Sequence, residues 1–407
     1  MFRTNSIYRH ACCVAALLLA IPVFAKSSTG SSVSGSSAFN RGQSSVEDLV
    51  GQMLLAAGLE GERLIVERRA VSAEIHALAD TLGIGKASYR RARRLHRHLH
   101  RKYLHEYDPD ADGLHRILRS GRYNCQAATF FMGLVAREMG MGVQVLESPG
   151  HLKLRLMLSR RTVEVETTSS TGFDVGPYHE RLQPGPFRLD ESSRRLGLQP
   201  AREGGYWQVT LEQSVGFAWL NTAWRALEEG DPTRAAGYVL NARTYLPDLH
   251  EHADGVRKLF ARAFSLAYDA GRFEDAHRIA MIDIGIFPDS VHSQDRVIAA
   301  ALRLVGFLCD GDDPLAAELL LSEIESRAPI TATNLRRRTS PAVVAAAVRL
   351  QDWELAREAA RRFAAAEPDW REVSRLMAWI DERSLHDPMP APEGECLDGV
   401  AGIERSF

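Results

Sequence analysis

A four-fold repeat in the C-terminal half constrains the fold of this chain more than any other feature. Each copy has a turn residue, an alanine five positions later and a proline about twelve positions further on, and the copies recur about every 40 residues. The four sets are Gly230, Ala235 and Pro247; Gly271, Ala276 and Pro288; Gly311, Ala316 and Pro329; and Gln351, Ala356 and Pro368. A turn, a helix with a small residue for close packing and a proline stop predict a helical hairpin. We therefore expect an all-α helical-hairpin solenoid over residues 211–386.

Residues 46–175 have a different pattern, which predicts an α+β domain. Apolar residues at helical spacing predict helices over 46–57, 65–82, 87–104, 114–118 and, as a buried helix, 126–139. Three segments then predict strands, namely 143–146, 152–158 and 162–167. Leu152, Leu154 and Leu156 alternate with charged residues, as in a half-buried strand.

The N-terminus is typical of a signal peptide. Basic residues precede an apolar run that is short for a membrane span and ends in Val23-Phe-Ala25, so we assign residues 1–25 to the signal. We expect a periplasmic or secreted protein, tethered to a membrane only if this segment stays uncleaved. By composition we expect a flexible leader over 26–45, a linker or insertion over 176–210 and a disordered tail over 387–407.

Charge and cysteine content narrow the function classes. The net charge of −2 at pH 7 gives no argument for a nucleic-acid partner. Export would leave Cys125, Cys309 and Cys396, and an odd number means at least one unpaired thiol in a monomer. A Cys309–Cys396 bridge would leave Cys125 free, although the sequence alone does not establish that pairing.

Cys125 opens the predicted buried helix, and His151 and two glutamates follow it along the chain. A cysteine attacks as the thiolate, which a helix N-terminus and a nearby imidazole both favour. A carboxylate on the other ring nitrogen would orient the imidazole. Glu166 and its rival Glu164 share a face of the predicted strand, because strand residues two apart point the same way. The order predicts a catalytic set; a small buried cysteine with a solvated histidine and glutamate is the alternative.

The motifs around these residues resemble the transglutaminase-like superfamily, a papain-like Cys-His-acid group, and especially bacterial members followed by tetratricopeptide repeats. The matching pieces are Leu114-His-Arg-Ile-Leu118, Tyr123-Asn-Cys-Gln-Ala127, Leu134-Val-Ala-Arg-Glu-Met-Gly140, Pro149-Gly-His151 and Val165-Glu-Thr-Thr168. The resemblance implies Cys125 as nucleophile, His151 as base and Glu166 as orienting acid. The chain departs from the family in having Glu166 where many members have aspartate, Gln126 where an aromatic residue often follows the nucleophile, and a repeat longer than the usual ~34 residues.

The resemblance implies an exported cysteine hydrolase, with a papain/transglutaminase-like α+β domain followed by a tetratricopeptide-like solenoid. The reaction would be acyl transfer at an amide of a protein or peptide substrate. Water is the expected acceptor, because nothing in the sequence suggests a dedicated amine site. The repeats would bind a partner or dock the substrate. The alternative is a catalytically silent scaffold or adaptor that acts through its helical repeats.

Two other clusters could suggest a metal, but we expect neither a metal nor a cofactor. His96 and His100 would share a helix face, as metal-binding pairs do, with His98 beside them. Their neighbours are mostly cationic, which predicts a solvated basic face. The acids of Asp108-Pro-Asp-Ala-Asp112 alternate like the start of a calcium loop but lack its late glutamate, so we predict a turn.

Overall fold

The structure is a computed structural model that describes residues 44–148, 151–175, 207–246, 253–368 and 372–385. The described chain is mostly helical with one small sheet region, and it divides into two compact units. The first unit runs from Gln43 to Ile286, and the described part of the second begins at Phe287. The predicted signal peptide, nearly all of the leader, most of the linker and the tail with Cys396 lie outside the described residues.

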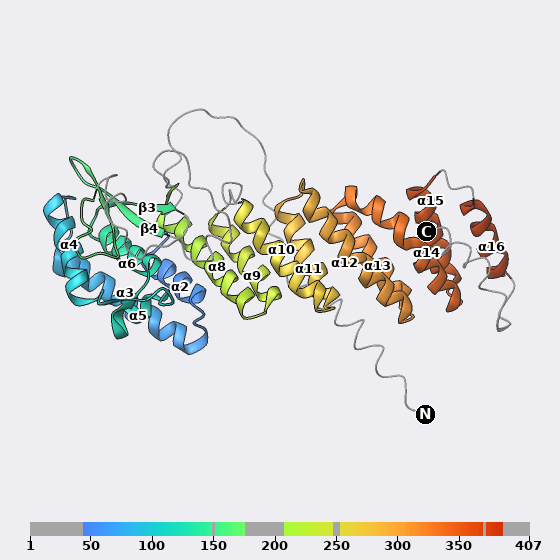
Figure 1. Cartoon of the computed structure of the whole chain (residues 1–407), viewed down its shortest axis with the longest axis horizontal. Helices are drawn as coiled ribbons and strands as arrows, with labels where there is room; N and C mark the ends of the chain where they lie inside the picture. The colour runs from blue at the N-terminus through green and yellow to red at the C-terminus, as the bar shows by residue number, and fades with distance from the viewer. Residues whose placement is uncertain (1–43, 149–150, 176–206, 247–252, 369–371, 386–407) are drawn as a thin grey trace, which may run out of the picture. The chain divides into compact units, whose positions relative to one another are not determined.

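The predicted helices of the N-terminal region are confirmed. They are α2 (Val46–Ala56), α3 (Gly61–Leu82), α4 (Tyr89–Lys102), α5 (Leu114–Ser120) and α6 (Cys125–Glu138). Helix α6 contacts the sheet and α3, α4 and α5, and its residues 126–136 are all buried (Figure 1). Apart from Gln126 and Thr129 these residues are apolar or small, which accounts for the central position of the helix.

The sheet is antiparallel, with strand order β5-β4-β3-β6. The three predicted strands are present as β3 (Gly142–Ser148), β4 (His151–Met157) and β5 (Thr162–Val165). The fourth, β6 (Trp207–Val209), falls within the segment predicted as a linker or insertion, where no strand was predicted. A two-stranded parallel pair, β1 (Glu106–Tyr107) and β2 (Arg122–Tyr123), had no predicted counterpart.

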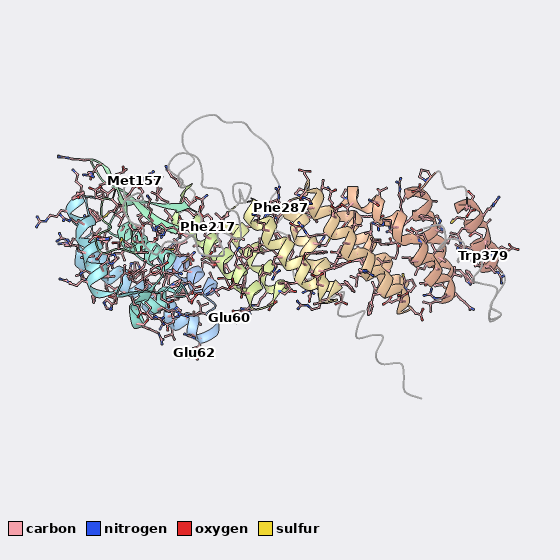
Figure 2. All side chains as sticks on the ribbon, viewed as in Figure 1. Glu60, Glu62, Met157, Phe217, Phe287 and Trp379 are labelled. Carbon is pink, nitrogen blue, oxygen red and sulfur yellow. The ribbon has the colours of Figure 1, made fainter. Side chains whose placement is uncertain are left out.

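Burial along strand β4 follows the predicted alternation only in part. Its three leucines are buried and Met157 at its end is exposed, but Lys153 between two of the leucines is also buried, at 4% exposure (Figure 2). Gly133 of α6 lies so close to β4 and α8 that an ideal Cβ there would be 3.3 Å from Leu154 Cδ2 and 2.8 Å from Leu211 Cδ2. A larger residue at 133 would therefore separate α6 from its neighbours on both sides.

Helical hairpins follow the sheet, as the repeat predicts. The first unit contains α8 (Leu211–Glu228), α9 (Pro232–Tyr245), α10 (Ala253–Asp269) and α11 (Phe273–Ile286). The second contains α12 (Val291–Asp310), α13 (Pro314–Arg327), α14 (Pro329–Arg349), α15 (Trp353–Ala366) and α16 (Val373–Leu385). The second helix of each repeat, α9, α11, α13 and α15, has 14 residues. Within the described ranges, no helix combines the length and apolarity needed to cross a membrane.

The hairpin turns correct the predicted alignment of the third repeat. Each turn has one residue with positive φ, at Gly230, Gly271, Asp312 and Gln351. Gly311 has an ordinary φ of −84°, so the equivalent position in the third repeat is Asp312. The small residue that packs in that repeat is consequently Ala317, which is buried, and not Ala316, which is half-buried.

The first hairpin packs against the sheet-containing region within the first unit. Helix α8 contacts α2, α6 and β3. The Thr222 hydroxyl donates to the carbonyl of Ala56 at 2.5 Å, and Arg137 on α6 pairs with Glu212 at 2.9 Å. Through these contacts α8 helps to fix the position of α6.

Candidate active site

Cys125 is the first residue of α6, and Asn124 fixes where the helix begins. The Asn124 side chain accepts a hydrogen bond from the Ala127 N–H at 2.8 Å and donates to the Pro109 carbonyl at 3.2 Å. Its own N–H donates to the carbonyl of Ala111 at 3.1 Å. The helix start is thereby tied to the 108–112 turn, and Cys125 is left half-exposed at the positive end of the helix dipole.

His151 opens β4, and its ring lies between Cys125 and Glu166. Its Nε2 is 2.6 Å from Glu166 Oε2, with only 15% and 13% of the two side chains exposed. Burial disfavours the charged ring, but the hydrogen bonds with Cys125 and Glu166 outweigh it and raise the pKa of His151 to about 10. The imidazolium is therefore the ring's dominant form at neutral pH.

Glu166 is oriented by the turn that follows β5. Its Oε1 accepts hydrogen bonds from the Thr168 N–H at 3.1 Å and the Thr168 hydroxyl at 2.6 Å, which leaves Oε2 for His151. Burial would raise the pKa of Glu166, but the bonds from His151 and Thr168 hold it below the ordinary value. The turn is tight, because a Cβ on Gly172 would lie 2.2 Å from the Glu166 carbonyl oxygen.

Glu164, the rival acid, lies in a separate group of charges. It pairs with Lys153 at 3.0 Å and with Arg155 at 2.7 Å, both on β4. Burial opposes its ionisation, yet these two cations keep the pKa of Glu164 lowered. The geometry thus brings Cys125, His151 and Glu166 together and leaves Glu164 with the cations of the neighbouring strand.

The prediction that this histidine cluster lies on a solvated basic face is wrong for His96. This side chain is 1% exposed, and its Nε2 donates to the Ser169 carbonyl at 3.0 Å. His100 lies beside it with ring centroids 4.6 Å apart and hydrogen-bonds to the backbone of Thr167. Burial lowers the pKa of both rings, that of His100 to about 4, so both are neutral at pH 7. Arg97, between them in the sequence, does face solvent.

The acidic turn at residues 108–112 connects neighbouring elements through ion pairs. Asp108 pairs with Arg122 at 2.8 Å, and Asp112 pairs with Arg225 of α8 at 2.5 Å. Across the described ranges, no group of three or more His, Cys, Asp or Glu residues has the arrangement of a metal site.

Two neighbours of the site, Tyr123 and Gln126, were named in the sequence motif but were assigned no function there. Tyr123 is buried and donates its hydroxyl to the Thr168 carbonyl at 3.2 Å, which ties the strand before Cys125 to the turn after Glu166. Gln126 is buried, and its Oε1 accepts a hydrogen bond from Asn221 of α8 at 3.1 Å. The only sequence signal for Gln126 was its departure from the family pattern.

Comparison with known proteins finds no family model that matches this chain and no significant match among the curated proteins.

Proposed function

We propose that this protein is a transglutaminase-like cysteine hydrolase that cleaves amide bonds in proteins or peptides. The observation that supports this most strongly is the 2.6 Å contact between His151 and Glu166, with Cys125 on the same ring and at a helix N-terminus. A thiol, an imidazole and an orienting carboxylate in this order are the components of nucleophilic acyl transfer.

Acylation would begin with attack of the Cys125 thiolate on the carbonyl carbon of the amide. The backbone N–H of Cys125 would stabilise the oxyanion. Because Nε2 of His151 faces Glu166, the Nδ1 side of the ring would deliver a proton to the departing amine. The C–N bond then breaks and leaves a thioester on Cys125.

Deacylation would use the same groups in reverse. The His151 ring, now neutral, would take a proton from water as the water oxygen attacks the thioester carbonyl. Collapse of that intermediate releases the carboxylic acid and restores the thiolate–imidazolium pair. Glu166 would keep the ring oriented throughout and stabilise its positive charge.

The helical repeats favour an additional role in binding a partner or the substrate. In the second unit, Phe307 on α12 and Leu319 on α13 are 66% and 61% exposed, so apolar side chains of the repeats are accessible to a partner. The same exposed apolar side chains favour the second candidate function, a catalytically silent adaptor that acts through its repeats. Export to the periplasm or beyond stays a prediction.

Incubation of the full chain with a complex peptide library, followed by mass spectrometry of new termini, tests the proposal. We expect cleavage by the wild-type protein and by Glu164→Gln, but not by Cys125→Ala. An equal yield of new termini from wild type and Cys125→Ala would exclude the hydrolase. If Cys125→Ala also retains the wild-type protein's cellular phenotype, the adaptor function is favoured.

A further inference from the structure

His96, which is buried, and His100, which is half-buried, lie behind the turn that carries Glu166. Both come from α4, one helical turn apart, and both direct a ring nitrogen to that turn: His96 to the Ser169 carbonyl at 3.0 Å, His100 to the Thr167 backbone. We propose that His96 and His100 are positioning residues for the candidate active site, which hold the 166–172 turn so that the Glu166 carboxylate stays on His151. This inference rests on the proposed function, because it assigns the two residues a role at the same site.

The hydrogen-bond geometry defines the role of each ring. Because a carbonyl only accepts, His96 must donate through Nε2–H, and this fixes its tautomer. His100 lies against the backbone of Thr167. The two rings therefore contact the backbone on either side of Thr168, the residue that orients Glu166 Oε1.

Neutrality suits this role. A cationic histidine beside Glu166 would compete with His151 for the carboxylate, because each charge would attract it. The titratable side chains that interact electrostatically with the two rings are Glu166 for both and, for His100, also His96. Burial keeps both rings uncharged, so they restrain the turn without drawing the carboxylate away from the catalytic ring.

The test is a pH titration of the His151 ring, monitored by NMR of labelled histidine. It uses the full chain with Cys125→Ala in every variant. We expect His96→Leu, which removes the donor, to lower the His151 midpoint by about 1 pH unit or more, the lower end of what a neighbouring opposite charge contributes. His96→Gln, whose amide can reach the position of Nε2, should restore the wild-type midpoint. His100→Leu and His100→Asn form a second matched pair if His96→Leu does not fold.

The outcomes separate this inference from the proposed function. A folded leucine variant that keeps the wild-type His151 midpoint overturns the positioning role. The positioning role is also overturned if the Gln and Asn variants lower the His151 midpoint as much as the leucine variants do. Altered packing alone would then account for the effect. If the midpoint shifts as expected but the wild-type protein cleaves no peptide, the positioning role stands and the hydrolase proposal fails.

Discussion

At the scale of single residues, the identity of the acid decides the chemistry of the site. Glu164 and Glu166 are two positions apart, so strand periodicity gives them the same face and cannot choose between them. The pairing of β4 with β5 makes the difference. It sets Glu164 opposite Arg155, whereas Glu166 follows the last strand residue and reaches His151. That register cannot be read from either strand alone.

Glu166→Gln should lower the pKa of His151 from about 10 towards its ordinary value, because the ring loses its anionic partner. The raised pKa of His151 stabilises the folded chain fully at pH values below the pKa of the unfolded chain, near 6.5. This stabilisation is lost as pH rises through the pKa of the folded chain. The variant should therefore lose stability at neutral pH. NMR titration of His151 measures the shift. Glu164→Gln is the control, and an equal effect from both variants would contradict the assignment.

A buried arginine in the second unit provides a stability test at the same scale. Arg336 is 2% exposed and pairs with Glu318 at 2.5 Å and Glu325 at 2.7 Å. Arg336→Ala removes one of the two arginines that pair with the buried Glu318 and leaves Arg362 at 2.9 Å. The loss should therefore be that of strong charged hydrogen bonds, roughly 1.5–3 kcal/mol. Hydrogen exchange of α13–α15 measures the loss locally. Arg337, half-exposed beside Glu367, is the control, and its alanine variant should cost below about 1 kcal/mol.

At the scale of elements, the sequence predicted helices and hairpins well and their exact alignment less well. Periodicity located α2 to α6 because each buries an apolar face. The third repeat was misaligned because Gly311 looked like the left-handed turn residue, whereas Asp312 occupies that conformation. Strand β6 is only three residues long, too short for a periodic signal. The burial of His96 was missed because its helix is so rich in arginine.

The turn before α15 leads to a stabilising substitution. Gln351 has φ of 58°, a left-handed conformation that Gly230 and Gly271 adopt at the equivalent positions. Gln351→Gly should therefore raise the free energy of unfolding by about 1 kcal/mol, because glycine has no Cβ to strain. Urea denaturation checks this. Gly230→Gln is the reverse change and should destabilise; stabilisation by it would contradict the argument.

At the scale of the whole molecule, pH should act on stability through buried histidines. Burial lowers the pKa of His100 and of His115 to about 4. Between about pH 6.5 and 5 each of these two rings binds a proton in the unfolded chain but not in the folded chain, so both lower the free energy of unfolding as pH falls. Glu147, whose pKa burial raises to about 8, acts in the opposite direction. The lowered carboxyl pKa values add a further loss only below about pH 4.5.

Denaturant unfolding at pH 7 and pH 5 measures this loss. His115→Gln removes one titrating group and should make the difference between the two pH values smaller. His292→Gln, at an exposed position, is the matched control substitution. The same pH difference in His115→Gln as in the wild-type chain would contradict the assignment of a neutral, buried His115 ring.

The most direct test of the account is the rate of iodoacetamide alkylation of Cys125 at about pH 5.5, read by mass spectrometry. Cys309 is an internal control, because burial raises the pKa of its thiol to about 11. If His151 and the helix N-terminus hold a thiolate, Cys125 should react at least about tenfold faster than a cysteine in an unstructured peptide, and His151→Gln should abolish the advantage. Equal rates for Cys125 and the peptide would contradict the central claim.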